Sequence, residues 1–212
     1  MSLSRPLQIA ACALALALPL AASAQTKSAT AASAAPAVPV TEVAGVKFDN
    51  EINLRGSKLV LNGAGVRYKV VFKVYAAGLY VPAKVNTPEA VYDTKGARSL
   101  RVVMLRDIDA NELGKLFTQG MEKNATREEF AKAIPGTIKL GEIFATKNKL
   151  TSGESFTIDY LPGVGTAITV DGKPTGEVIR EPEFFSALMK IWLGKSPADS
   201  LLKDALLGNS RN

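Results

Sequence analysis

The chain has 212 residues, a formal net charge of +6, no histidine and one cysteine, Cys12. Cys12 lies in a segment expected to be removed, so the mature chain has neither histidine nor cysteine. This excludes a His-assisted or thiolate nucleophile, a disulfide and any zinc site built from Cys or His. We expect no metal and no organic cofactor. Its Lys and Arg residues are scattered, which argues against a nucleic-acid interface, whereas the positive charge suits an anionic ligand or a transient contact with a membrane surface.

The N-terminus has the pattern of a secretory signal peptide. Arg5 gives a positive start, residues 7–20 are almost wholly apolar, and Ala22-Ser23-Ala24 is a small-x-small cleavage signal. The apolar run is too short and too rich in alanine to favour a transmembrane helix, which needs roughly 20 apolar residues. We therefore expect residues 1–24 to be removed by cleavage after Ala24, and the protein to be periplasmic or secreted.

A leader and one domain are expected after the cleavage point. Residues 25–43 are rich in Ala, Ser and Pro and offer few large apolar side chains to bury, so they are expected to be disordered. Residues 44–208 are long enough to bury a sizeable core without disulfides, and a short tail, 209–212, follows. The oligomeric state is not indicated by the sequence.

The sequence predicts strands in the first part of the domain. Two short strands are expected over 46–54 and 58–61. Asn62-Gly63 and Gly65 supply turn chemistry, and the Val-rich and aromatic segment that follows predicts one long strand beginning at Val66.

Two polar side chains on this long strand form the strongest candidate site. Period-two alternation puts Arg67 and Tyr75 on the same strand face. Both donate hydrogen bonds, and a guanidinium is a fixed fork suited to a carboxylate or phenolate oxygen, so the pair can hold an anionic head group. The alternative is a solvent-facing strand face that carries three cations, Arg67, Lys69 and Lys73.

Helices and strands alternate in blocks through the rest of the domain. A helix opened by Thr87-Pro88 and a strand over 99–105 precede Arg106-Asp107, which is expected to be a strand-end ion pair. Asp109 caps an amphipathic helix, and a capping box at 126–129 begins a second helical segment, with a kink or break expected at Pro135-Gly136. The apolar side of this second segment is expected to comprise Phe130, Ala133, Ile134, Ile138, Ile143 and Phe144.

A strand meander and two further helices complete the domain. Strands are expected over 155–160, 165–170 and 173–179, with a hairpin turn at Asp171-Gly172. A helix from Pro182 to Gly194 carries core aromatics that include Trp192, and a last short helix covers 200–207. The order of elements predicts an α+β domain with helices on one face of an antiparallel sheet.

Several sequence blocks, taken together and in order, resemble the chalcone isomerase-like proteins. They are residues 61–67 (LNGAGVR), 72–80 (FKVYAAGLY), 105–108 (LRDI), 159–163 (DYLPG) and 184–194, from Phe184-Phe185 to Ile191-Trp192-Leu193-Gly194. The resemblance implies an open-faced β-sandwich, a large antiparallel sheet covered by a layer of helices with a ligand cleft between them. It also implies one of the three functional classes of the family: enzymes that close a chalcone to a flavanone, proteins that bind fatty acids, and relatives without catalytic activity.

Site residues follow from the same resemblance. The plant enzymes hold the phenolate with an arginine that matches Arg67, and Tyr75 falls where they place a threonine near the substrate ketone. Phe117 and Asn124 match a tyrosine and an asparagine, and Ile191 matches a late threonine. If the chain is an enzyme, Arg67, Tyr75 and Asn124 are its expected catalytic residues. If it is a binding protein, all five are expected ligand contacts, although Asn124 has the alternative role of ending its helix.

The missing hydroxyls at Phe117 and Ile191 predict poor isomerase activity. A hydrogen-bond donor that is shielded from water beside a developing enolate stabilises the transition state by about 3 kcal/mol. The expected function is therefore the binding of a small anionic or hydrophobic ligand, a fatty acid or a phenolic compound. An isomerase of chalcone isomerase type with an unknown substrate, and a partner-binding envelope protein without catalysis, remain the alternatives.

Overall fold

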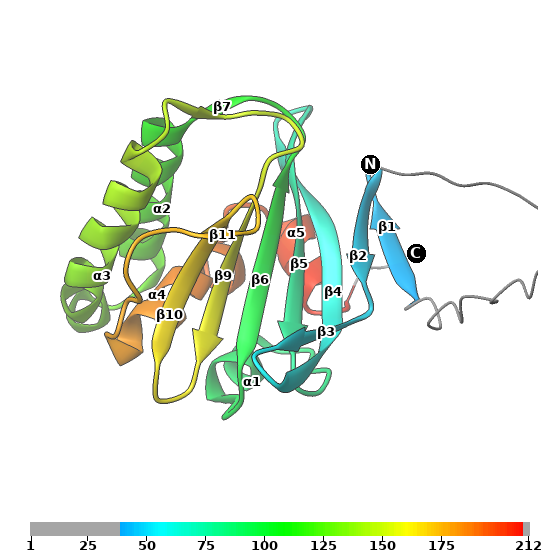
Figure 1. Cartoon of the computed structure of the whole chain (residues 1–212), viewed down its shortest axis with the longest axis horizontal. Coiled ribbons are helices and arrows are strands. Elements are labelled where there is room, and N and C mark those ends of the chain that lie inside the picture. The colour runs from blue at the N-terminus through cyan, green and yellow to red at the C-terminus, as the bar shows by residue number, and fades with distance from the viewer. Residues whose placement is uncertain (1–38, 210–212) are drawn as a thin grey trace, which may run out of the picture. The chain divides into compact units, whose positions relative to one another are not determined.

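An antiparallel sheet and a layer of helices make up residues 39–209, the part of the chain that this computed structural model describes (Figure 1). The strands are β1 (Val40–Val43), β2 (Val46–Asp49), β3 (Glu51–Leu54), β4 (Ser57–Lys69), β5 (Phe72–Val81), β6 (Arg98–Met104), β7 (Ile108–Asp109), β8 (Lys149–Leu150), β9 (Ser155–Leu161), β10 (Gly165–Val170) and β11 (Lys173–Pro174). The helices are α1 (Pro88–Asp93), α2 (Ala110–Asn124), α3 (Arg127–Ala145), α4 (Pro182–Leu193) and α5 (Ser200–Leu206).

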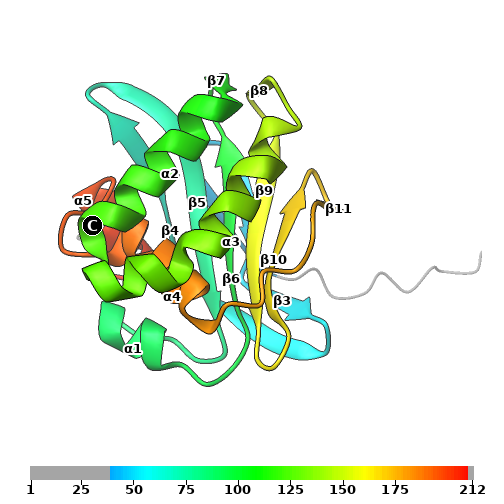
Figure 2. The same ribbon diagram turned by 90° about the vertical axis from the view of Figure 1, so that its left-hand side faces the viewer.

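Seven strands form one sheet in the order β11-β10-β9-β6-β5-β4-β3, and all neighbours are antiparallel. Helices α2, α3 and α4 cover one face, as the view through the helical layer shows (Figure 2). The β1–β2 hairpin lies on the other side, where Phe48 is fully buried in a second, smaller core with Ala76 and Tyr80 of β5. The predicted α+β class and helix-covered antiparallel sheet are confirmed.

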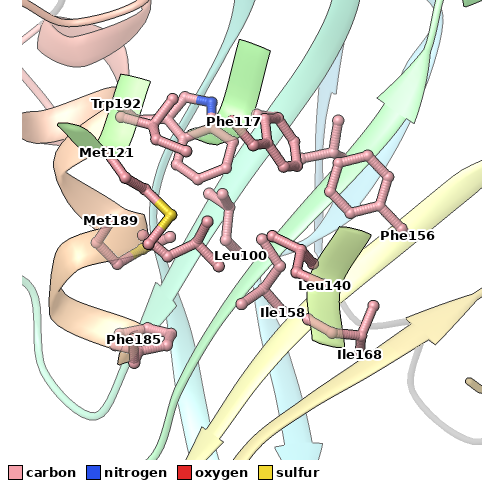
Figure 3. Packing of buried hydrophobic residues seen from close by; sticks show 14 of the residues in the cluster. Leu100, Phe117, Met121, Leu140, Phe156, Ile158, Ile168, Phe185, Met189 and Trp192 are labelled. Atoms are coloured by element: carbon pink, nitrogen blue, oxygen red, sulfur yellow. The ribbon is translucent and has the colours of Figure 1, made fainter. Parts of the chain in front are cut away.

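The main core lies between the sheet and the helices, and aromatic rings from four elements meet in it (Figure 3). Phe117 of α2 makes edge-to-face contacts with Phe144, Phe156 and Trp192, with ring centroids 5.6, 5.9 and 5.5 Å away. Such contacts add to the free energy gained from burying the rings. The expectation that Trp192 is a core residue is therefore correct.

Capping residues and turn residues set the ends of several helices and strands. The Asp109 carboxylate accepts the N–H of Glu112 at the start of α2, and Thr126 with Glu129 forms the predicted capping box of α3. Asp171 and Gly172, both with positive φ, make the predicted turn after β10. These caps and turns involve residues close together in sequence, which is why the pattern of residues predicts them.

The segment predicted as a turn followed by one long strand is a hairpin instead. Strand β4 runs through Asn62-Gly63 with an irregular pairing there, and the chain turns back at Val70-Val71. The glycines serve a close packing contact: a Cβ on Gly63 would overlap the backbone carbonyl of Ala205 in α5. Helix α5 can lie against β4 only because this part of the strand lacks side chains.

Helix α3 is continuous through Pro135, so of the two expected outcomes, a kink or a break, the break is wrong. Pro135 lies on the exposed side, and the carbonyl that loses its helical partner belongs to an exposed residue, so water can replace the bond. Ile134 and Ile138, predicted to face the core, are 44% and 57% exposed. The buried stripe runs instead through Ala133, Gly136, Leu140, Ile143 and Phe144.

Three smaller expectations also differ from the structure. Residues 40–43, assigned to the disordered leader, form β1, which pairs with β2 across a turn at Ala44-Gly45. The return strand predicted over 173–179 is limited to β11 and one bridge at Ile179. Asp107 pairs with Lys149 at 2.8 Å rather than with Arg106, which lies over the ring of Phe72.

The predicted signal peptide, most of the leader and residues 210–212 lie outside the described residues. Between residues 39 and 209, no helix combines the length and apolar character needed to cross a membrane.

Candidate functional site

Arg67 and Tyr75 lie together as cross-strand partners in the β4–β5 hairpin. The guanidinium carbon of Arg67 lies 5.6 Å from the centre of the Tyr75 ring. Their predicted proximity is therefore correct, but for a different reason: the two residues face each other on paired strands, whereas the sequence pattern put them on one face of one strand. A directly opposed antiparallel pair holds its side chains closer than residues eight apart on a strand.

A pocket of about 260 Å³ opens beside this pair, between the sheet and the helices. Its lining combines the two strand residues with one side of α2, Ile191 of α4 and the loop that leads to α5; the lining residues are Arg67, Tyr75, Leu113, Leu116, Phe117, Gln119, Gly120, Lys123, Ile191, Ser196, Pro197 and Ala198. A lining that combines apolar side chains with a few polar groups is typical of sites that bind small molecules.

The guanidinium of Arg67 has unused hydrogen-bonding capacity. Its Nε is buried, and within the described part of the chain it has no hydrogen-bond partner. The carboxylate of Asp199 accepts the backbone N–H groups of Leu201, Leu202 and Tyr68 at 2.8 to 3.1 Å and makes no hydrogen bond with this Nε. Leaving a buried charged donor unpaired costs several kcal/mol by order of magnitude, so an anion or water is expected to complete this site.

Tyr75 presents a neutral hydroxyl. Its side chain is 1% exposed, and its oxygen accepts the indole N–H of Trp192 at 2.8 Å. Burial raises the Tyr75 pKa to about 12, although the Arg67 charge and the Trp192 hydrogen bond act in the opposite direction. Trp192 thus fixes the ring, and the hydroxyl retains its proton at neutral pH and can donate it to an acceptor.

Stability should fall at high pH partly because of Tyr75. Its pKa is about 12 in the folded protein against the ordinary 10.0, so between these values the folded state keeps a proton that the unfolded chain has lost. The stabilisation is complete below pH 10 and is lost as pH rises through 12, a change of about 3 kcal/mol. Urea unfolding on both sides of this range should show a smaller loss for Tyr75→Phe, and an equal loss in both proteins would contradict the assignment.

Phe117 and Ile191 both line the pocket, as the ligand-binding prediction requires. They are 2% and 3% exposed, and Ile191 packs against Gly120, where an added Cβ would lie 3.1 Å from its side chain. The glycine therefore lets α2 and α4 approach closely. These side chains offer only carbon atoms to a ligand.

Asn124 does not line this pocket. Its amide nitrogen donates to the carbonyls of Gly120 and Ser196, both at 2.9 Å, and its oxygen accepts the Ser196 N–H at 2.7 Å. The carboxamide thus ties the end of α2 to the loop that carries Ser196 into the pocket wall. This positioning role is close to the alternative of a helix-ending residue, and the lining of this pocket gives no support to a catalytic or ligand-contacting role of Asn124.

Sequence reasoning missed Lys123 and the hydrogen bond from Trp192. Lys123 lies seven residues after Leu116 and three after Gly120, so helical spacing puts these pocket residues on one side of α2. The Trp192 contact joins residues 117 positions apart, and no local pattern signals it. In residues 39–209, no group of three His, Cys, Asp or Glu side chains is arranged to hold a metal ion.

Comparison with known proteins agrees with this architecture. The family model described as chalcone isomerase-like matches residues 40–208. A crystal structure of a fatty-acid binding protein from Arabidopsis thaliana superposes with a TM-score of 0.59 at 14% sequence identity, covering 78% of this chain and 93% of the plant chain. At this identity the superposition shows a shared fold. A search of curated protein sequences gave no match.

Proposed function

We propose that this chain, which belongs to the chalcone isomerase-like family, binds a small anionic amphiphile in the pocket beside Arg67 and Tyr75. The observation that carries the proposal is the buried Nε of Arg67, which has no partner among the described residues and belongs to a side chain that lines the pocket. An anionic oxygen there would satisfy the donor and offset the cost of burying it.

The head group would be held by two kinds of donor. The guanidinium of Arg67 can make charge-assisted hydrogen bonds to a carboxylate or phenolate, and the neutral hydroxyl of Tyr75 can donate to the same oxygen. Lys123, which is exposed on α2, adds a second positive charge at the pocket. Two cations and a neutral donor favour an anion over an uncharged polar group.

The apolar part of the ligand would contact Leu113, Leu116, Phe117 and Ile191. Each methylene buried there contributes about 0.8 kcal/mol. The volume of about 260 Å³ is slightly below the roughly 300–1,000 Å³ of common ligand pockets, which favours a short or medium chain or a single-ring phenolate. The plant neighbour, whose title names it a fatty-acid binding protein, supports a fatty acid as the first ligand to test.

Binding without turnover fits this pocket better than catalysis. Isomerisation would need polar groups beside a developing negative charge, whereas at the positions that match the plant enzymes Phe117 and Ile191 supply only hydrocarbon and Asn124 is engaged elsewhere. Tyr75 is the one tyrosine in the lining of the pocket, so a single phenolic hydroxyl is present there. Flavanone formation from a chalcone above the rate in buffer would establish the catalytic alternative.

Arg67→Met should weaken the binding of decanoate by roughly 10- to 100-fold, because a hydrogen bond to a charged group is worth about 1.5–3 kcal/mol. Methionine keeps an apolar side chain of similar reach and removes an unpaired buried donor, so the variant should be at least as stable as the parent protein. Calorimetric titration with decanoate provides the dissociation constant for both proteins.

Two controls distinguish recognition of the charged head group from nonspecific hydrophobic binding. Lys115→Met removes an exposed cation of α2 that is not part of this pocket and should leave decanoate binding unchanged. Decanol, which has the same chain and no charge, should bind more weakly than decanoate and should be nearly insensitive to Arg67→Met. Equal affinity of the parent protein and Arg67→Met for decanoate would refute the proposal.

A further inference from the structure

The end of the β4–β5 hairpin exposes an unusual concentration of apolar side chains. We define the hairpin tip as residues 68–73. In it, Val70, Val71 and Phe72 are 90%, 76% and 58% exposed, and Tyr68 is 39% exposed. Elsewhere in the described residues, exposed large apolar side chains occur singly or in pairs. Single exposed apolar residues are ordinary, whereas a contiguous group marks a contact surface.

The tip is also built from residues poorly suited to a tight turn. Val70 has φ 61°, a left-handed conformation that β-branched residues avoid and that glycine or asparagine adopts easily. Neither the turn geometry nor exposure to water explains valine at this position. A role in contacting something outside the domain explains both its chemistry and its location.

Cations surround the apolar tip. Lys69 and Lys73, both exposed, flank Val70, Val71 and Phe72 in the sequence, and the guanidinium carbon of Arg106 lies 5.0 Å from the centre of the Phe72 ring. Glu112 approaches Lys69 at 3.7 Å, with both side chains more than half exposed, while the carboxylate of Asp107 is engaged with Lys149. Lys73 and Arg106 form no ion pair with another described residue, so the tip keeps a positive charge.

The shape of the tip narrows the choice of partner. The hairpin extends beyond the helical layer as a narrow projection, seen at the upper left of Figure 2. A stable protein interface buries roughly 800 Å² on each partner, whereas the apolar surface of the tip comes from four exposed side chains, Tyr68, Val70, Val71 and Phe72. A membrane interface accepts a few inserted side chains, with aromatic rings at the headgroup level and Lys or Arg beside anionic phosphates.

We infer that the hairpin tip docks the protein on an anionic lipid bilayer, with Val70, Val71 and Phe72 entering the interface and Lys69, Lys73 and Arg106 contacting the headgroups. The inference does not depend on the proposed ligand. If both hold, docking brings the membrane close to Arg67, because Arg67, Lys69 and Arg106 line a second cavity of about 260 Å³ at the base of the hairpin. Three carboxylates, those of Asp107, Asp109 and Glu112, line the same cavity.

Vesicle co-sedimentation tests the docking directly. Protein purified after any N-terminal processing should sediment with vesicles of phosphatidylcholine and phosphatidylglycerol, and much less with phosphatidylcholine alone. The double variant V71S/F72S should lose at least about tenfold in vesicle affinity, since it removes two of the three inserted side chains. The variant K73Q/R106Q should bind anionic vesicles more weakly and with a smaller dependence on salt.

Matched variants keep the result interpretable. I138S/L201S removes two apolar side chains, 57% and 70% exposed, that lie outside the tip, and should bind vesicles like the parent protein. In F72W, the new indole should shift its emission to the blue with anionic vesicles against the constant background of Trp192, which is 1% exposed.

Three outcomes would overturn the inference: unchanged vesicle binding by V71S/F72S, equal binding to neutral and anionic vesicles, or a tip-dependent dimer in sedimentation that does not bind vesicles. Decanoate titration of V71S/F72S reports on the pocket separately, so failure at the membrane and failure of ligand binding are distinguishable.

Discussion

Trp192→Ala is expected to lower the free energy of unfolding by about 3–5 kcal/mol, the range for removing a large aromatic side chain from a packed core. The indole is 1% exposed and packs against Phe117 with ring centroids 5.5 Å apart. Its loss would also leave the buried hydroxyl of Tyr75 without its donor. Urea unfolding at neutral pH, followed by far-ultraviolet circular dichroism, measures the change.

A double-mutant cycle separates volume from hydrogen bonding in this effect. Trp192→Phe keeps much of the ring and removes the N–H, and Tyr75→Phe removes the acceptor. The double variant should be more stable than the sum of the two single losses predicts, because it leaves no unsatisfied partner. A cost below about 1 kcal/mol for Trp192→Ala would mean that this part of the core is not packed as described.

Gly63→Val is expected to destabilise the protein by about 3 kcal/mol or more, at the upper end of the effects of overpacking. The new Cβ would overlap the backbone carbonyl of Ala205, and a backbone atom cannot move aside as a flexible side chain can. Helix α5 would have to separate from β4 and expose Leu202 and Leu206, which are now buried. Thermal unfolding and limited proteolysis near residue 205 report the two parts of this effect.

Gly114→Ala is the matched control for that substitution. Gly114 lies inside α2, and a Cβ added there would meet no atom within 4 Å. Alanine should therefore raise stability by about 0.5–1 kcal/mol through helix propensity. Should Gly63→Val cost no more than an exposed glycine substitution, the close approach of α5 to β4 would be wrong.

Local chemistry made much of this fold predictable. The Asp109 cap, the Thr126 capping box and the Asp171-Gly172 turn each depend on residues within a few positions of one another, and the structure confirms all three. Alternation in the central strands likewise places Leu100 and Val102 on the helix-covered face. Such patterns reflect burial on one side of an element, which a sequence displays directly.

Contacts between distant residues explain the errors. The pattern predicts a turn at Gly63 because glycine is common in turns, but the role of Gly63 is set by Ala205, 142 positions later. The true turn at Val70-Val71 was missed because it lacks turn chemistry. A kink or break is expected at Pro135, yet α3 continues through it, because Pro135 lies on the solvent side of the helix, where losing one hydrogen bond costs least.

In the candidate site, too, residue types are predictable from the sequence, whereas contacts between distant residues are not. Arg67 and Tyr75 were identifiable from residue type and from family resemblance, and Phe117 and Ile191 line the same pocket. The role of Asn124 depends on the loop at Ser196, and the donor to Tyr75 comes from Trp192 near the end of the domain. Neither partner is close in sequence, so only the assembled fold shows which polar groups are engaged and which are left for a ligand.

The Nε–H resonance of Arg67 offers the most direct test of the binding site. In isotopically labelled protein, this signal can be assigned by its loss in Arg67→Met and followed by NMR during titration with decanoate. The predicted result is a downfield shift and slower exchange with water as the carboxylate accepts the hydrogen bond, with no such change on addition of decanol. A signal that stays unchanged while decanoate binds to the protein would place the anion elsewhere and contradict the proposed role of Arg67.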